Sequence, residues 1–319
     1  MNTLPESTGQ LGGWTDSDWN SILYPIYEGT CTPFLGAGAA AGILPLGGQL
    51  AADWAREYEY PFRRGRKNLI RVAQYVSVKQ GSHVLRQQIR SMFAWRPRGK
   101  YLHDRVWPIF SNEDEPHRVL ASLNLPVYIT TNYDTYMTLA LRHVDKKPRR
   151  EVCQWYNATR RARAKRGAAG LPAPSAERPL VYHLHGHFSI PESMVLTEDD
   201  YIDFLTNVSN EKLQVIPPYI QKLFPTTTFL FVGYSLEDIN FRFLFRKLAE
   251  QMGPQKYFSH ISVQLQPQQF ETPEKLRQRA QRQLAYLQEQ FSKREVKVFW
   301  GTAEDFAREL RRRWEDFRP

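Results

Sequence analysis

The sequence predicts an α/β fold: a Rossmann-like, doubly wound and mostly parallel sheet with a helical insertion or cap. Short apolar runs recur at wide spacing, helix-like segments lie between them, and glycine or polar residues directly follow several runs. Strands that alternate with helices in this way are typical of a parallel sheet covered on both faces. Ligands of such sheets bind beyond the carboxyl ends of the strands, where the strand order reverses. The ends of the apolar runs are therefore the place to look for a site.

Six apolar runs are the expected strands, namely 32–35, 126–131, 180–185, 228–233, 260–265 and 296–300. A helix is expected first at 16–27, and a second one over 49–60 that Pro61 stops. Apolar residues at helical spacing over 68–93, with a break at Gly81-Ser82, predict two more helices. We interpret 51–104 as a helical insertion or cap, and expect charged C-terminal helices at 273–292 and 303–317.

Composition excludes several classes of protein. The 319 residues are 42% hydrophobic, which provides a sizeable core, and we expect a single domain over 1–319. No apolar run approaches the ~20 residues that span a bilayer, and no secretion signal is visible at the N-terminus. Cys31 and Cys153 are too few for a disulfide framework or a four-thiolate zinc site. We expect a cytoplasmic protein.

Lys and Arg number 43 against 33 Asp and Glu, a formal net charge of +10, and much of this excess lies in 142–166. We interpret 142–180 as a basic, Pro- and Ala-rich insertion loop. Two interpretations stay open: a solvated loop, or an arm that contacts phosphates or a partner protein, with Trp155 and Tyr156 stacking on bases. No zinc-finger, helix-turn-helix or RNA-binding motif accompanies the segment, so contact with nucleic acid is a secondary hypothesis.

Glycines follow the first and fourth expected strands. Gly36-Ala37-Gly38 lets a phosphate approach the backbone without a Cβ in the way, and a helix starting there would add positive charge. Gly-Ala-rich turns are common, however, and the spacing is one residue longer than the dinucleotide fingerprint. Gly233 and Ser235 follow the fourth strand as a nucleotide-contacting turn would, although a turn with a capped helix explains them too.

Polar residues follow the second and third expected strands. Asn132 and Asp134 come directly after a β-branched pair, where they either enter a cleft or cap the next helix. His183, His185 and His187 end the third strand, and alternation predicts that the first two face the same way. This spacing without a nearby cysteine is a poor zinc pattern, so we expect no metal. We expect one active histidine and two that take no part.

Taken in order, these segments resemble the sirtuin family, and more closely its bacterial branch of sirtuin-like NAD-consuming proteins of antiphage defence. The similar segments are FLGAG (34–38), ITTNYD (129–134), LHG (184–186), VLTEDDY (195–201) and FVGYSLED (231–238). The resemblance implies that Asn132 and His185 are catalytic. It also implies that the NAD site is lined by Gly36, Ala37, Gly38, Asp134, Gly233 and Ser235.

The departures from the family indicate which reaction to expect. Deacylating sirtuins hold a zinc ribbon with four cysteines, and their Asp-Phe-Arg stretch is replaced here by 44–48. Both changes argue against an acyl-lysine substrate, whereas Ala39-Ala40-Ala41 in place of the loop serine affects the expected ribose-phosphate contacts. The resemblance therefore implies an NAD+ glycohydrolase that needs no metal and releases nicotinamide and ADP-ribose.

The bond between nicotinamide and ribose breaks through an oxocarbenium-like state. Asn132 is expected to position water or the ribose hydroxyls, and Asp134 to bind the carboxamide. His185, with an ordinary pKa near ~6.5, is expected to accept a proton near neutral pH.

An unregulated NADase would kill its host, so the resemblance implies control by homo-oligomer assembly or by a partner protein such as an ATPase or an Argonaute. A non-catalytic sensor of NAD or an ADP-ribose-type nucleotide is the first alternative. A nucleic-acid-binding module is the second and a deacylase the third.

Overall fold

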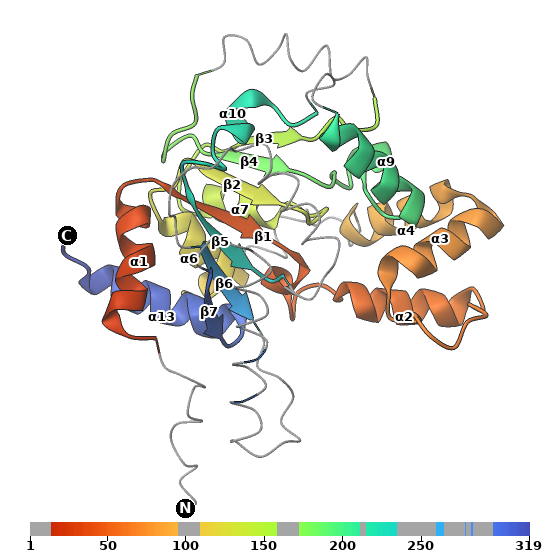
Figure 1. The fold of residues 1–319 in the computed structure, drawn as a ribbon, viewed down its shortest axis with the longest axis horizontal. Helices are drawn as coiled ribbons and strands as arrows, with labels where there is room; N and C mark the ends of the chain where they lie inside the picture. The colour runs from red at the N-terminus through yellow and green to blue at the C-terminus, as the bar shows by residue number, and fades with distance from the viewer. Residues whose placement is uncertain are drawn as a thin grey trace, which may run out of the picture.

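The computed structural model describes residues 14–94, 109–157, 172–210, 215–234, 260–264 and 296–319, with the single positions 278 and 282. Within them, seven strands form one sheet in the order β3-β4-β2-β1-β5-β6-β7, and every pairing is parallel (Figure 1). The strands are β1 (Cys31–Leu35), β2 (Val127–Thr130), β3 (Arg149–Val152), β4 (Leu180–His183), β5 (Thr228–Val232), β6 (His260–Gln264) and β7 (Val296–Trp300). The predicted α/β class is confirmed.

The strand order reverses at β1, which has β2 on one side and β5 on the other. The register brings the carboxyl ends of four strands to one level. Leu35 at the end of β1 pairs with Thr130 of β2 and with Val232 of β5. Thr130 in turn pairs with His183, the last residue of β4. The residues that follow β1, β2, β4 and β5 therefore start side by side, at the position where such sheets bind ligands.

Helices cover both faces of the sheet. They are α1 (Asp16–Tyr27), α6 (Pro116–Ser122), α7 (Tyr136–His143), α9 (Glu198–Ser209), α10 (Pro218–Gln221) and α13 (Ala303–Asp316). Buried residues of α1, α6, α7 and α13 form the first core cluster with one face of the sheet, and α9 and α10 form the second core cluster with the other. Alternation along the strands divides the sheet between them, since Phe34 belongs to the second cluster and Leu35 to the first.

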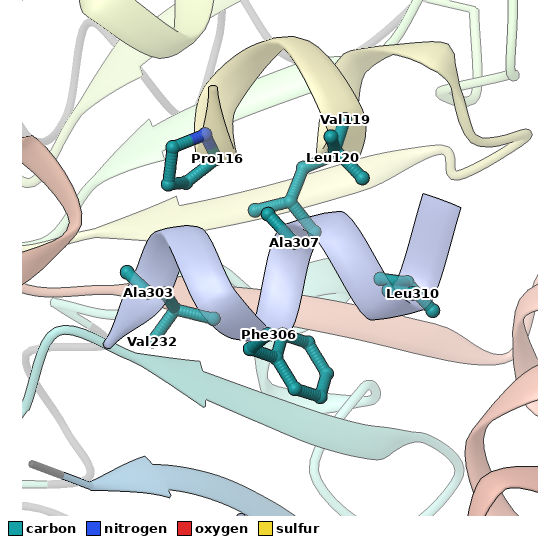
Figure 2. A pocket seen from close by; sticks show the side chains of 8 residues that line it. All are labelled: Pro116, Val119, Leu120, Val232, Ala303, Phe306, Ala307 and Leu310. Atoms are coloured by element: carbon teal, nitrogen blue, oxygen red, sulfur yellow. The ribbon is translucent and has the colours of Figure 1, made fainter. Parts of the chain in front are cut away.

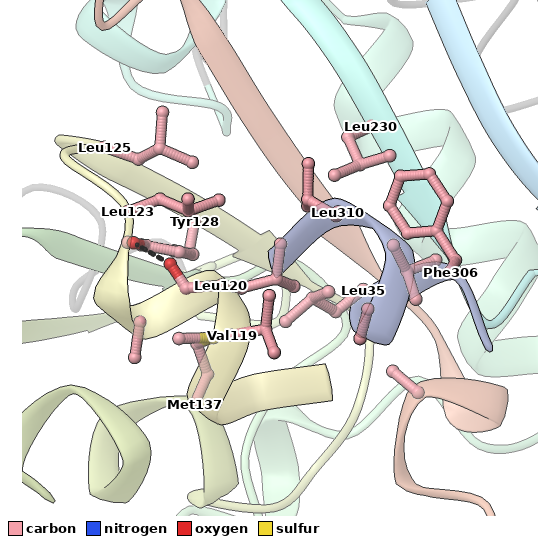
Figure 3. Close-up of a cluster of buried hydrophobic side chains, with 14 of the residues drawn as sticks. Leu35, Val119, Leu120, Leu123, Leu125, Tyr128, Met137, Leu230, Phe306 and Leu310 are labelled. Atoms are coloured by element: carbon pink, nitrogen blue, oxygen red, sulfur yellow. Dashed lines mark hydrogen bonds between the residues drawn. The ribbon is translucent and has the colours of Figure 1, made fainter. Parts of the chain in front are cut away.

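In the first core cluster, apolar side chains of α6 and α13 lie against the sheet. Figure 3 shows Leu310 and Phe306 of α13 beside Leu35 and Leu230 of the strands, and the Tyr128 hydroxyl donates to the carbonyl oxygen of Leu120 over 2.9 Å. A small hollow between α6, α13 and β5 is lined by eight side chains, all of them apolar (Figure 2). An apolar hollow of this kind offers no hydrogen bonds to a nucleotide, so it belongs to the core.

Three helices begin with a threonine that both caps the first turn and receives a carboxylate in return. Thr15, Thr197 and Thr302 precede α1, α9 and α13, and each accepts from the backbone N–H three residues later. The aspartate at that later position accepts from the backbone N–H of the threonine, as in a capping box. This local chemistry explains why 16–27 was predicted with the correct bounds. None of the described helices has the length and apolar character needed to cross a membrane.

Helices α2 (Gly47–Glu57), α3 (Leu69–Gln80) and α4 (Ser82–Ala94) form a separate group with its own buried cluster (Figure 1). The predicted break at Gly81 is confirmed, because this residue has φ +89° between α3 and α4. A largely buried ion pair between Arg86 of α4 and Asp200 of α9, 2.5 Å long, fixes the group to the rest of the protein. Residues 95–104 of the expected cap lie outside the described residues.

The segment 142–180 is not a loop throughout. Arg149–Val152 form the edge strand β3, which pairs with β4, so the loop expectation is wrong there. The sequence of this strand lacks the usual apolar run, because an edge strand, which is paired on one side only, tolerates charged residues that a central strand excludes. Trp155 is 5% exposed and its Nε1 donates to the carbonyl oxygen of Ser193, which leaves its ring unavailable for stacking on bases. Residues 158–171 lie outside the described residues.

Candidate functional site

The glycines after β1 and β5 allow two loops to touch. The N–H of Gly36 donates to the carbonyl oxygen of Val232, and that of Gly38 donates to Gly233 over 3.0 Å. A Cβ on Gly36 would lie 2.7 Å from the carbonyl oxygen of Gly233, and one on Gly38 would lie 2.9 Å from its Cα. The Gly233 backbone itself is left-handed, with φ +78°. Close approach of backbone to backbone therefore requires these glycines, whatever ligand they bind.

No α-helix starts directly after these glycines, so the positive charge that such a helix would add is absent there. A four-residue 3₁₀ turn, η1 (Ala37–Ala40), follows Gly36 instead, and α2 starts only at Gly47. The small residues of 36–42 instead form the contact with the β5 loop. The dipole of a regular α-helix is therefore not available at this position to attract a phosphate. Ala37 is exposed beside the loop contact.

Asn132 is held at the end of β2 by three hydrogen bonds. Its backbone N–H donates to Thr130 Oγ1 over 3.0 Å, and its carbonyl oxygen accepts from His183 Nδ1 over 3.2 Å. Its side-chain Nδ2 donates to the carbonyl oxygen of Gly36 over 2.9 Å. The Oδ1 atom accepts no hydrogen bond from the described part of the chain. The amide is thus oriented by its nitrogen, and its oxygen is left to accept a hydrogen bond from something else.

A tyrosine that sequence reasoning missed ties the loops together. The hydroxyl groups of Tyr234 and Thr131 are hydrogen-bonded, which joins the end of β5 to the end of β2. The Tyr234 ring also packs edge-on against Phe34 of β1, with the ring centroids 5.5 Å apart. Its place directly after Gly233 was the only available signal, since one tyrosine is not a motif. Ser235, the next predicted site residue, lies outside the described residues.

The segments that carry Asn132 and His185 lie side by side. The N–H of Leu184 donates to the carbonyl oxygen of Thr130 over 2.8 Å, and that of Phe188 donates to Tyr133 over 3.0 Å. These backbone bonds flank both predicted catalytic residues, so the two loops run together beyond the adjacent strands β2 and β4.

His185 does not share the neighbours of His183, contrary to the expected alternation. Its ring lies against Tyr201 and Phe204 of α9, at centroid distances of 5.5 and 5.0 Å. Strand β4 ends at His183, and the two-residue alternation ends with it. Burial lowers the pKa of His185 to about 3, and its Nε2 is buried without a hydrogen-bond partner among the described residues. The expectation of an ordinary pKa is therefore wrong.

The other two histidines form a pair of their own. The rings of His183 and His187 meet edge to face with centroids 4.7 Å apart. His187 Nε2 lies 3.0 Å from the Arg150 guanidinium, and its Nδ1 lies 2.7 Å from Ser189 Oγ. Burial lowers the pKa of His183 to about 4 and that of His187 to about 2, with the Arg150 charge as a further cause. Both imidazoles are neutral near pH 7.

Asp134 is buried beside an acid and a histidine that sequence reasoning did not single out. Its Oδ1 accepts from the N–H of Tyr136 over 2.8 Å, and its Oδ2 has no hydrogen-bond partner among the described residues. Glu115 Oε1 lies 2.6 Å from His117 Nδ1, and both side chains are almost fully buried. Burial raises the pKa of Asp134, and attraction to His117 opposes that rise. Asp134 thus begins α7 through Oδ1 and keeps a second oxygen for another donor.

Comparison with known proteins agrees with this geometry. The family model of the SIR2-like domain matches residues 126–291, which is more than half of the chain. The chain belongs to this family. The matched part of the SIR2-like domain contains β2, β3, β4, β5 and β6 and starts after the glycine loop of β1. Among its described residues, no group of three His, Cys, Asp or Glu side chains is arranged to hold a metal ion.

Several curated proteins are similar to this SIR2-like chain, and each is named NAD(+) hydrolase ThsA. The protein of Cytobacillus dafuensis is 28% identical over 234 residues, which are 73% of this chain and 40% of the relative. That of Enterococcus faecium is 31% identical over 126 residues, or 40% of this chain and 23% of the relative. That of Bacillus cereus (strain MSX-D12) is 31% identical over 138 residues, or 42% and 24%. The chain therefore spans less than half the length of these relatives.

Proposed function

We propose that this SIR2-like domain is an NAD+ glycohydrolase, which cleaves the bond between nicotinamide and ribose and releases nicotinamide and ADP-ribose. NAD is the substrate, and the site needs no metal. The similar proteins named NAD(+) hydrolase support this activity, although the match covers only 40% of the C. dafuensis protein.

The observation that carries the proposal is the amide of Asn132. Its nitrogen is bound to the carbonyl oxygen of Gly36, so its Oδ1 faces away from that bond as a fixed acceptor at the reversal of strand order. A fixed acceptor at this point suits a ribose hydroxyl or the attacking water. A group that is already oriented loses no freedom in the transition state, which is how positioning lowers a barrier.

His185 acts in this proposal as a neutral imidazole. With a pKa of about 3, it does not carry a proton at neutral pH, and it is a weak base because its burial penalises the charged form. Its role is therefore to accept a hydrogen bond from the ribose or from water. The aromatic rings of Tyr201 and Phe204 beside it exclude bulk water from the cation that develops on the ribose.

Asp134 binds the carboxamide of nicotinamide through Oδ2, which lacks a partner among the described residues. The loops of Gly36, Ala37, Gly38 and Gly233, with Ser235, line the rest of the NAD site. Gly36 and Gly38 act there chiefly by letting the β5 loop approach.

Incubation of the purified protein with NAD, followed by measurement of nicotinamide and ADP-ribose, tests the activity. Wild type is expected to release both, either alone or once the products of the neighbouring genes are added, and Asn132→Ala or His185→Ala to release neither under both conditions while remaining folded. Asn207→Ala is a matched control, because its Nδ2 also donates to a backbone carbonyl, that of Trp155, but from α9. The non-catalytic sensor would be supported instead if the purified protein binds NAD but releases no nicotinamide, and if cells that also express the neighbouring genes lose no NAD.

The resemblance also supplies the biological setting of the proposal. We infer an effector of antiphage defence in the bacterial cytoplasm, held inactive until it assembles as a homo-oligomer or meets a regulatory protein of the ATPase or Argonaute type. Cells that express wild type with and without neighbouring genes should differ in NAD loss, whereas cells with His185→Ala should not.

We propose that 1–319 is one NAD-binding domain, with 51–104 as its cap. Largely buried contact between Arg86 of α4 and Asp200 of α9 supports a cap fixed close to the helix that covers His185. Contact of the basic segment 142–166 with nucleic acid is the secondary proposal, and it now depends on arginines and lysines rather than on Trp155. Its test is a binding curve with a steep salt dependence that His185→Ala leaves unchanged.

A further inference from the structure

His183 is buried in the site without a role in the proposed reaction. It is 1% exposed, lies at the last position of β4, and contacts Asn132 rather than the rings around His185. A polar ring that is buried at this depth costs free energy unless its hydrogen bonds are used. One ring nitrogen of His183, Nδ1, makes a hydrogen bond, and its partner is Asn132, the residue on which the proposed activity depends.

We propose that His183 is a positioning residue for Asn132: its Nδ1–H holds the Asn132 carbonyl, and the Arg150–His187 pair holds His183. The inference rests on the proposed function, because it explains how the Asn132 amide is kept in place for NAD cleavage.

The hydrogen-bond partners define which nitrogen of His183 carries the proton. A carbonyl oxygen only accepts, so the contact of 3.2 Å to Asn132 requires a hydrogen on Nδ1. The ring is neutral because burial lowers its pKa to about 4, so Nε2 carries a lone pair and no hydrogen. That nitrogen has no partner among the described residues. The side chain of His183 therefore makes a single hydrogen bond among the described residues, and that bond is to Asn132.

A second layer fixes the ring from behind. Arg150 Nη1 lies 3.0 Å from His187 Nε2, and His187 Nδ1 accepts from the backbone N–H of Ser189 over 3.1 Å and lies 2.7 Å from Ser189 Oγ. The His187 ring so oriented meets the His183 ring edge to face. The support runs from the edge strand β3 through the β4 loop to the end of β2, three segments that only the tertiary fold brings together.

Loss of this support should affect Asn132 specifically. Its backbone has two anchors, Thr130 Oγ1 at the N–H and His183 at the carbonyl, and the bond from Nδ2 to Gly36 depends on both. Removal of the carbonyl anchor lets the peptide after Asn132 rotate, which moves the amide oxygen. Misplacement by about 1 Å is enough to reduce a rate by roughly 100-fold.

The test compares His183→Asn with His183→Leu in steady-state NAD hydrolysis. The Asn side chain places an N–H donor where Nδ1 stood, whereas Leu fills the space without a donor. We expect His183→Leu to lower kcat by about 10–100-fold with KM changed by less than about threefold, and His183→Asn to restore most of kcat. The matched control is His260→Leu, which removes an imidazole that is 2% exposed and lies in β6, on the other side of β1 and next to the edge strand β7. That variant should keep kcat.

A folded His183→Leu variant with wild-type kcat would overturn the proposal. A His183→Asn variant whose kcat is no higher than that of His183→Leu would also overturn it. If His183→Leu fails to fold, His183→Gln replaces it, because its amide reaches the Nε2 position and not Nδ1. If wild type releases no nicotinamide either alone or with the products of the neighbouring genes, the proposed function fails, and nitrogen-15 NMR of the imidazoles alone then tests the contact between His183 and Asn132. A His183 protonated on Nδ1, whose signal shifts in Asn132→Gly, supports the contact, and a proton on Nε2 refutes it.

Discussion

The side-chain nitrogen of Asn132 donates to the carbonyl oxygen of Gly36 over 2.9 Å, across the gap between the ends of β2 and β1. The same carbonyl oxygen accepts from the N–H of Ala39, so it closes the 3₁₀ turn after β1 as well. Asn132 thus orients itself on the glycine loop and helps to hold that loop. A substitution at either residue is therefore expected to alter the position of the other.

Replacement of this amide should separate activity from folding. Asn132→Ala is expected to reduce NAD hydrolysis by at least about 100-fold, since it removes the fixed acceptor. It should cost only about 0.5–1.5 kcal/mol of the free energy of unfolding, because one partly buried hydrogen bond is lost. Nicotinamide release and urea unfolding measure the two effects. Equal losses of activity in Asn132→Ala and the control Asn207→Ala would contradict a specific role.

The pH profile of kcat/KM tests the state of His185. A base must be deprotonated to act, and a pKa of about 3 keeps His185 deprotonated down to that pH. An exposed histidine would instead produce an acid limb near pH ~6.5. We therefore expect no limb from His185 between about pH 5 and 8.

Asp134 is another group that titrates at the site, and burial raises its pKa. The profile is therefore measured in Asp134→Asn as well. A limb near pH ~6.5 that persists in Asp134→Asn and disappears in His185→Ala would show that His185 titrates normally.

Substitution of two glycines with left-handed backbone, Gly42 and Gly233, distinguishes the cost of backbone strain from the cost of a steric clash. Gly42 has φ +85° and nothing within 4 Å of a Cβ, so Gly42→Ala should cost about 1–2 kcal/mol from backbone strain alone. Gly233 has φ +78°, and its Cβ would lie 2.1 Å from the backbone nitrogen of Ala39. Gly233→Ala should therefore cost about 2–5 kcal/mol and abolish NAD hydrolysis, because the two loops must separate.

Chemical denaturation of both glycine variants gives the comparison. A cost for Gly233→Ala no larger than that for Gly42→Ala would mean that the β1 and β5 loops are not in contact. Retention of NAD hydrolysis in Gly233→Ala would show that the contact is not needed for the site.

The buried pair of Glu115 and His117 should make stability depend on pH. Burial alone would lower the pKa of His117, but attraction and a hydrogen bond to Glu115 raise it above 6.5. The contribution of His117 is therefore complete below pH 6.5 and is lost as the pH rises through its pKa in the folded protein. The pKa of Glu115 is lowered from 4.5 although burial opposes this, so its contribution is present above pH 4.5 and is lost on acidification.

Glu115→Gln keeps the shape and an oxygen to cap α6, but removes the charge. The substitution should lower the free energy of unfolding by about 1.5–3 kcal/mol between pH 4.5 and pH 6.5, and by less at lower and at higher pH. Unfolding of wild type and Glu115→Gln over a pH series measures the difference. A difference between the two proteins that stays constant with pH would contradict a charged pair.

Local chemistry explains the parts that sequence analysis predicted correctly. The bounds of α1 follow from the Thr15 cap, and the break at Gly81 follows from a φ that other residues avoid. Six of the strands were expected, and five of them are central strands, which in a parallel sheet are buried on both faces and read as continuous apolar runs. The edge strand Arg149–Val152 was missed, since its residues are only partly buried and its charge looked like a loop.

The sequence by itself determined the class of fold, the ends of the strands where polar residues gather, and the resemblance to sirtuins, because each depends on residue types at short range. Only the tertiary structure decided what these residues touch. It placed Gly38 against Gly233, turned His185 toward α9 and His183 toward Asn132, and buried Trp155. The physical reason is that burial and hydrogen-bond partners, which decide the protonation of an imidazole and the orientation of an amide, come from segments far apart in the chain.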